Sequence, residues 1–328
     1  MIQLSPGTRK LLDLPPSERA LMCARDIWVN YPAAGVAINM VKHLASFPRR
    51  ASNPGLALIG SPGVGKSYLA QRWEKESFKP GSGWQGRVLY IDMSEETSKL
   101  SSDVEIRMLQ VIGMLYRGQP FSSSHQDYLS AIRAVKALNI RVVVFDEIRD
   151  LQERLTKTNV KKCLSALKGF SGRNWQLNVV VVGVSLLSEM LDGDDQLGTR
   201  YALRKMELPD WSYGAQPDGS IDLTSEIFQA MLLGVMCYMP LKGQSDVESH
   251  EFLSMLQQLA ATKHSETNGR GVCPLRSVMD LVTESCMQAI WSGEERIDAK
   301  SLLRTKERML GNFDADEYIE QYSRRNPA

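Results

Sequence analysis

Residues 60–67 read G-S-P-G-V-G-K-S and constrain the fold more than any other part of this chain. They match the pattern G-x-x-x-x-G-K-[ST] of a phosphate-binding loop. An apolar run at 56–59 precedes them and has the character of a buried strand, and residues 68–73 follow with helical spacing and no helix breaker. A strand, a glycine-rich loop and a helix in this order give the pattern its specificity. The sequence therefore predicts a phosphate-binding loop within an α/β fold.

The residue types of this loop suit a nucleoside triphosphate. Glycines let the backbone curl so that N–H groups face phosphate oxygens, and the following helix adds its positive N-terminal end. We expect Lys66 to reach the β- and γ-phosphates and the Ser67 hydroxyl to bind Mg²⁺. A glycine turn that binds nothing is the alternative, but such a turn does not require Lys-Ser at its end. The predicted ATP contacts are Gly60, Ser61, Pro62, Gly63, Val64, Gly65, Lys66, Ser67 and Tyr68.

A second motif, made of two acidic residues, follows the largely apolar run at 141–145. Asp146 and Glu147 come directly after this β-branched segment, which suits a strand of a parallel sheet covered on both faces. We expect Asp146 to bind the water shell of Mg²⁺ and Glu147 to polarise a water toward the γ-phosphorus. A strand that ends in a solvated acidic turn is the alternative. Together with the phosphate-binding loop, the motif predicts ATP hydrolysis.

Composition excludes several other classes of protein. The 39 basic and 38 acidic residues give a formal charge of +1, so any DNA contact must come from a local patch. The five cysteines are scattered and the four histidines stand apart, which favours reduced thiols over disulfides or a metal centre. The first 19 residues are polar, and the longest apolar run is too short to span a membrane. We therefore expect a soluble, cytoplasmic protein without a membrane partner.

Strand and helix patterns alternate through the first two thirds of the chain. Predicted strands lie at 56–60, 88–92, 142–146, 179–184 and 205–208, and predicted helices between them at 103–115, 127–138 and 159–170. This alternation indicates a doubly wound parallel sheet of five strands. Along the sequence, only one predicted strand lies between the phosphate-binding loop and the strand that precedes Asp146 and Glu147. This order of strands resembles that of the RecA-like and AAA+ ATPases. The predicted domains are a helical leader at 1–50, an AAA+ nucleotide-binding domain at 51–210, a small helical lid at 211–312 and a tail at 313–328.

Further motifs resemble the TniB/TnsC-type AAA+ ATPases that regulate transposition. Residues 11–19 read L-L-D-L-P-P-S-E-R and residues 28–31 read W-V-N-Y, similar to the leader of that family. Residues 164–169 read L-S-A-L-K-G and resemble the L-K-x-h pattern, with h an apolar residue, that ends a helix in that family. Residues 194–201, D-D-Q-L-G-T-R-Y, resemble its D-x-Q-L-x-x-R-F. The L-P-D-W at 208–211 matches the family's L-P-x-W, which generic ATPases lack. The resemblance extends from about residue 10 to residue 310.

The chain departs from the family at three places. Arg149 stands where the family usually has a histidine. Ser185 lies one place beyond the usual polar residue of the fourth strand, so it is a candidate sensor of the γ-phosphate or a helix N-cap. The lid arginine is also displaced, so that Arg276 or Arg270 could contact the nucleotide or be a solvated residue at a helix start.

The resemblance also implies a shared active site between subunits. Arg200 lies where AAA+ rings place an arginine that completes the γ-phosphate site of a neighbour, with Arg204 as a substitute. A surface ion pair of Arg200 with Asp194 or Asp195 is the alternative. Basic residues that could contact DNA phosphates in a ring, or simply be solvated, are Lys157, Lys161, Lys162, Arg107 and Arg117.

The function that the resemblance implies is ATP-dependent regulation of transposition. With ATP and Mg²⁺ bound, subunits would form a homo-oligomeric ring or helical filament on double-stranded DNA, largely independent of base sequence. The assembly would recruit a DDE transposase and respond to a target-selection protein or complex, and hydrolysis would disassemble it. A DnaC/IstB-like helicase loader is the alternative. A signalling ATPase is a third interpretation, although the sequence shows no effector domain.

Overall fold

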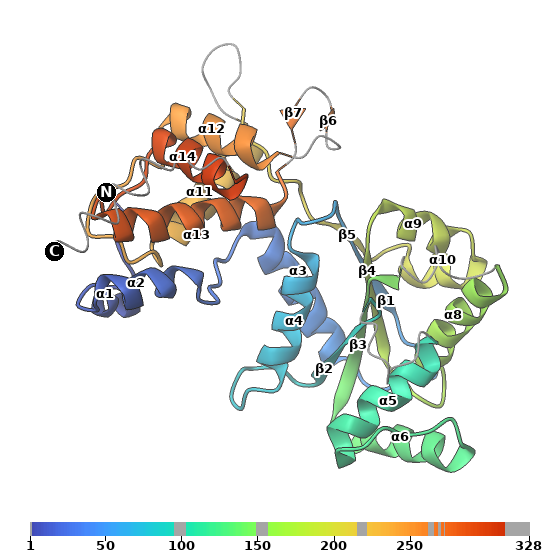
Figure 1. Cartoon of the computed structure of the whole chain (residues 1–328). Helices are drawn as coiled ribbons and strands as arrows, with labels where there is room; N and C mark the ends of the chain where they lie inside the picture. Colours follow the sequence, from blue (N-terminus) through green and yellow to red (C-terminus); the bar gives the residue numbers. More distant parts are fainter. Residues whose placement is uncertain are drawn as a thin grey trace. The chain divides into compact units, whose positions relative to one another are not determined.

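The computed structural model describes residues 2–94, 103–148, 157–214, 222–261, 266–267, 270–271 and 273–311, with side chains of 157–160 and 266–271 left aside. The chain forms two compact units, shown with their elements in Figure 1. One comprises Ala33–Leu208, and the other combines Met1–Pro32 with Pro209–Ala328. We describe each unit by itself.

A five-stranded parallel sheet forms the centre of the first unit. Its strands are β1 (Gly55–Ile59), β2 (Arg87–Asp92), β3 (Ile140–Asp146), β4 (Asn178–Gly183) and β5 (Lys205–Glu207), in the order β2-β3-β4-β1-β5. The predicted five-stranded parallel sheet is confirmed, with strand ends that differ from the prediction by at most two residues. Because β4 lies between β1 and β3, the carboxyl ends of these three strands meet at one edge of the sheet.

Helices cover both faces of this sheet, as Figure 1 shows. Alternate residues of a strand point to opposite faces. Val143 and Phe145 therefore join the core beneath α5, α6 and α8, whereas Val142 and Val144 lie on the face toward α3 and α4. The helices are α3 (Pro32–Ser46), α4 (Lys66–Ser77), α5 (Val104–Arg117), α6 (His125–Ala137), α8 (Lys157–Phe170), α9 (Ser185–Asp192) and α10 (Asp195–Tyr201). Burial on both faces explains why the strands are almost entirely apolar.

The second unit is mainly helical. Its helices are α1 (Pro6–Leu11), α2 (Pro16–Leu21), η1 (Met22–Ala24), α11 (Leu223–Met236), α12 (His250–Ala260), α13 (Leu275–Ser292) and α14 (Ala299–Met309), and β6 (Glu266–Thr267) pairs antiparallel with β7 (Arg270–Gly271). Helix α2 packs on α13. There Arg19, buried to 1% exposure, donates hydrogen bonds to Glu295 and to the Pro240 carbonyl. No helix in the described ranges is both long and apolar enough to cross a membrane.

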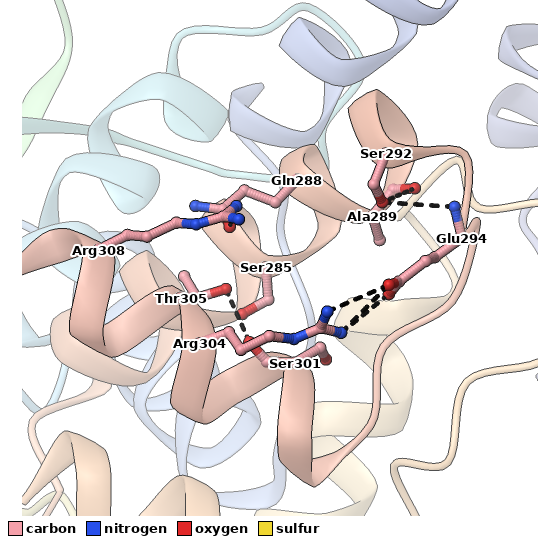
Figure 2. A pocket seen from close by; sticks show the side chains of 9 residues that line it. All are labelled: Ser285, Gln288, Ala289, Ser292, Glu294, Ser301, Arg304, Thr305 and Arg308. Carbon is pink, nitrogen blue, oxygen red and sulfur yellow. Dashed lines mark hydrogen bonds and ion pairs between the residues drawn. The ribbon is translucent and has the colours of Figure 1, made fainter. Parts of the chain in front are cut away.

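A small polar pocket lies between α13 and α14 of this unit, and Figure 2 shows its lining. Two arginines of α14 are held at its edge, because Arg304 pairs with Glu294 at 3.1 Å and Arg308 donates to Gln288 at 2.6 Å. No residue of the predicted nucleotide site lines this pocket.

The compact units divide the chain differently from the predicted domains. Residues 1–32 group with the C-terminal helices and residues 33–50 with the sheet, so the predicted leader at 1–50 is shared between the units. The change from one unit to the other at Pro209 is close to the predicted boundary after residue 210. The four-domain division stays a prediction, and the tail at 313–328 lies outside the described residues.

Candidate nucleotide site

The loop between β1 and α4 has the backbone shape that a phosphate-binding loop needs. Gly63 and Gly65 have φ angles of 79° and 100°, which side-chain-bearing residues rarely adopt. A Cβ at Gly60 would lie 3.0 Å from Val64 Cγ2 and 3.2 Å from the Leu208 carbonyl oxygen. The three glycines therefore fit the loop for conformational and steric reasons, and a bulkier residue at any of them would deform it.

Lys66 is the first residue of α4 and lies within the loop. Its side chain is 6% exposed, and Nζ donates hydrogen bonds to the carbonyl oxygens of Gly60 (2.8 Å) and Ser61 (2.9 Å). Gly65 is the N-cap of α4 and supplies no side-chain cap. The positive helix end and a buried ammonium group thus converge on one loop, which is the donor set that a triphosphate requires.

Asp146 joins this loop to the acidic motif. It ends β3, is fully buried, and lies near the Ser67 hydroxyl, which acts to lower the pKa of its carboxyl. Its Oδ2 accepts from the Tyr90 hydroxyl at 2.9 Å, and its Oδ1 accepts from the Glu147 N–H at 2.9 Å. Burial raises the pKa of the Asp146 carboxyl, while Ser67, Tyr90 and the Glu147 N–H oppose that rise and nearby Asp92 adds to it. A buried carboxylate beside a loop hydroxyl is a donor set suited to Mg²⁺ and its water shell.

Glu147 has an unusual backbone conformation at the end of β3. Its φ angle is 53°, in the left-handed region that residues with long side chains adopt infrequently. The hydrogen bond from its N–H to Asp146 stabilises this conformation, and the following Ile148 is anchored in the core at 1% exposure. The same conformation occurs at Asn139, Gln176 and Glu295 outside the site, so the predicted role of Glu147 stays a prediction. Arg149 lies outside the described residues.

Strand β2 contributes residues that the sequence analysis did not identify. Tyr90 contacts Asp146, and Asp92 is the register partner of Asp146 on the adjacent strand. Burial and the nearby Asp146 charge raise the pKa of Tyr90, so its hydroxyl keeps its proton and donates. Gln71 and Glu74 of α4 bond the Tyr90 hydroxyl and backbone N–H at 3.5 Å and 2.9 Å. Polar residues at alternate positions near the carboxyl end of an apolar strand were the available signal.

Ser185 lies just after β4, the strand that neighbours β1 in the sheet. Strand β4 ends at Gly183, the register partner of Ile59, and the exposed Ser185 begins α9. The N-cap of α9 is Val184, so the alternative that Ser185 caps this helix is wrong. Its role as a γ-phosphate sensor stays a prediction.

The candidate arginines occupy different environments. Arg200 is partly exposed, and its Nη1 donates to the Lys168 carbonyl (3.2 Å) and to the Ser171 hydroxyl at the end of α8. Asp194 pairs instead with Lys168 at 2.7 Å and caps α10, so an ion pair of Arg200 with that aspartate is not what holds the arginine. Arg204 is partly exposed.

In the second unit, Arg276 is exposed in the first turn of α13, and the side chain of Arg270 lies outside the description. The roles of Arg200, Arg204 and Arg276 stay predictions.

The predicted basic group does not form one surface. Lys161 and Lys162 are exposed on α8, and the Lys157 side chain lies outside the description. Arg107 is 2% exposed, so its assignment to a DNA-facing surface is wrong. Arg117 bonds the Pro120 carbonyl and Asp127 and lies over the Phe121 ring, which gives it a structural role.

Comparison with known proteins identifies a family and a fold. A family model described as Bacterial TniB protein matches residues 19–213, more than half of the 328 residues. No curated protein matches the chain.

Solved structures resemble the chain over most of its length. The ORC1 protein of Aeropyrum pernix in complex with DNA has a TM-score of 0.58 and 15% identity, covering 88% of this chain and 69% of that one. Cdc6p from Pyrobaculum aerophilum has a TM-score of 0.57 and 15% identity, covering 87% and 69%. Drosophila ORC bound to DNA has a TM-score of 0.53 and 12% identity, covering 94% and 68%. At these identities the likeness is one of fold, and the predicted AAA+ P-loop fold with its helical region is confirmed.

Proposed function

The chain belongs to the TniB family, and we propose that it is an ATP-dependent regulator of DNA transposition. With ATP bound, its subunits assemble on double-stranded DNA as a ring or helical filament and recruit a DDE transposase. Hydrolysis then releases the assembly, so the ATPase sets how long a target stays marked. A target-selection protein or complex is the further partner that this scheme needs. Family membership favours this function over that of a helicase loader.

The observation that carries the proposal is the link from α4, the helix that follows the phosphate-binding loop, through Tyr90 to Asp146. It brings the phosphate-binding loop and the acidic strand end together, although the two are far apart in sequence. Lys66 and the loop N–H groups bind the β- and γ-phosphates of ATP. Ser67 and Asp146 would hold Mg²⁺ and its water shell, and the ion would supply positive charge against the phosphates.

Glu147 and Arg200 complete the proposed active site. The Glu147 carboxylate orients the attacking water and takes its proton, the role of a general base. Arg200 of one subunit faces the γ-phosphate of its neighbour and stabilises the charge that develops there. In the single subunit its Nη1 donates to the end of α8, so the support for this role is the place of Arg200 in the chain, between β4 and β5. Ser185 and Arg276 are the proposed sensors of the nucleotide.

DNA binding rests on the family and on charge. The ORC and ORC1 structures that share this fold are complexes with DNA. In this chain, exposed Lys161 and Lys162 of α8 are the proposed phosphate contacts, which carry no base specificity.

A binding experiment with labelled duplex DNA tests the function. Fluorescence anisotropy should show strong binding with a slowly hydrolysed ATP analogue and Mg²⁺, and weak binding with ADP or without nucleotide. Lys66→Ala should lose both nucleotide and DNA binding, because the triphosphate is left without its main cation. The control for Lys66→Ala is Arg117→Ala, which replaces an arginine that has a structural role. Equal duplex binding with and without nucleotide would contradict the proposal.

A further inference from the structure

Tyr90 connects the two halves of the nucleotide site. Its hydroxyl donates to Asp146 Oδ2 at 2.9 Å and accepts from Gln71 Nε2 at 3.5 Å. Its backbone N–H donates to Glu74 Oε1 at 2.9 Å. Gln71 and Glu74 both lie on α4, the helix that begins with Lys66. One residue of β2 is therefore bonded to the loop helix on one side and to the acidic strand end on the other.

The Asp146 carboxylate depends on these donors because it is fully buried. A buried carboxylate oxygen without a donor is unfavourable, so both oxygens must be satisfied by protein groups or by bound water. In the structure Glu147 N–H serves Oδ1 and Tyr90 serves Oδ2. Ser67 lies near the carboxylate, but under the proposed function its hydroxyl would bind Mg²⁺. Tyr90 then remains as the side-chain donor that fixes Asp146.

We infer that Tyr90 is a positioning residue for the Mg²⁺ site, acting through Asp146. The inference rests on the proposed function, because it assumes that Asp146 holds the water shell of Mg²⁺. Donors behind a metal-binding carboxylate fix its orientation, and their loss commonly weakens metal affinity about tenfold or more. Tyr90 has no predicted contact with the nucleotide itself, so its removal should alter metal dependence and leave metal-free nucleotide binding intact.

The experiment measures binding of a slowly hydrolysed ATP analogue while the Mg²⁺ concentration varies. Tyr90→Phe keeps the ring and removes only the hydroxyl. We expect the Mg²⁺ concentration at half-saturation to rise about tenfold, with unchanged analogue affinity in EDTA. The matched control is Tyr128→Phe, which removes another half-buried hydroxyl of the same unit, bonded to Trp175 Nε1 at 2.8 Å. This control should leave the Mg²⁺ dependence as in the wild type.

A double variant shows whether Tyr90 acts through Asp146. Asp146→Asn should itself raise the Mg²⁺ concentration at half-saturation, and adding Tyr90→Phe to it should cause no further rise. A wild-type Mg²⁺ dependence in Tyr90→Phe, or a full additional effect in the double variant, would overturn the inference. If Asp146→Asn leaves the Mg²⁺ dependence unchanged, the metal assignment of the proposed function fails instead. The two failures are therefore distinguishable.

Discussion

Glu147 is the residue whose substitution separates nucleotide binding from hydrolysis. Glu147→Gln keeps the shape of the side chain and removes the charge that accepts a proton from water. We expect ATP and Mg²⁺ binding close to the wild type, hydrolysis slower by about 10²–10⁴-fold, and longer residence on DNA. Steady-state phosphate release and dissociation from labelled duplex measure these quantities. Hydrolysis at the wild-type rate would remove Glu147 from the proposed role.

Single residues were predictable from the sequence where a motif fixes both residue type and spacing. The loop of Gly60 to Ser67 and the Asp146-Glu147 pair belong to this class, and the structure places the loop before α4 and Asp146 at the end of β3, while their roles stay predictions. The alternation of polar residues along β2 could have marked Tyr90 as a candidate, but its contact with Asp146 was not predictable, because Asp146 lies on a neighbouring strand and no local spacing relates the two. Arg107 was assigned wrongly, because its charge suggested a surface position that the packing of α5 does not provide.

At the scale of elements, the pairing of α2 with α13 predicts how acid affects the second unit. Burial disfavours the charged form of Glu295, but hydrogen bonds from Arg19 and the Lys242 N–H outweigh burial and lower its pKa. A lowered folded-state pKa contributes stability above the unfolded-state value, and this contribution is lost as pH falls through the folded-state value. Acid should therefore weaken the attachment of α2.

Glu295→Gln tests this dependence by urea unfolding followed across pH. We expect a loss of about 1.5–3 kcal/mol near neutral pH, because the buried Arg19 loses its charged partner. The difference from the wild type should shrink as pH falls below the unfolded-state pKa of about 4.3, where the unfolded chain takes up the proton, and should vanish once pH is below the lowered folded-state value. Glu294→Gln is the control, since its pair with Arg304 is 44–45% exposed and exposed pairs contribute little. A constant difference at all pH values would contradict the assigned ion pair.

Element positions were largely predictable, whereas the grouping of elements was not. Apolar runs and helix periodicity located the five strands and the helices at 103–115, 127–138 and 159–170 to within two residues, because each pattern arises within a short segment. Pro16–Leu21 was predicted as part of one leader with α3, yet it packs on α13. The partner of Arg19 lies 276 residues away, and pairing over such a separation leaves no local signal.

At the scale of the whole molecule, the proposed role of Arg200 predicts an active site shared between subunits. Specific ATPase activity should rise with protein concentration and again with duplex DNA. Arg200→Ala and Lys66→Ala each lack a different part of that site, so both should be nearly inactive alone. Mixing them should restore some phosphate release, because some interfaces join an intact Lys66 to an intact Arg200. If the mixture shows only the sum of the activities of the two separate variants, each active site lies within one subunit.

The central claim is that ATP binding drives assembly on duplex DNA, and electron microscopy measures this most directly. The wild-type protein is imaged with duplex DNA and a slowly hydrolysed ATP analogue, and in parallel with ADP and with the Lys66→Ala variant. The account predicts rings or filaments that enclose the duplex only for the wild-type protein with the analogue. A protein that stays monomeric on DNA with the analogue bound would contradict it.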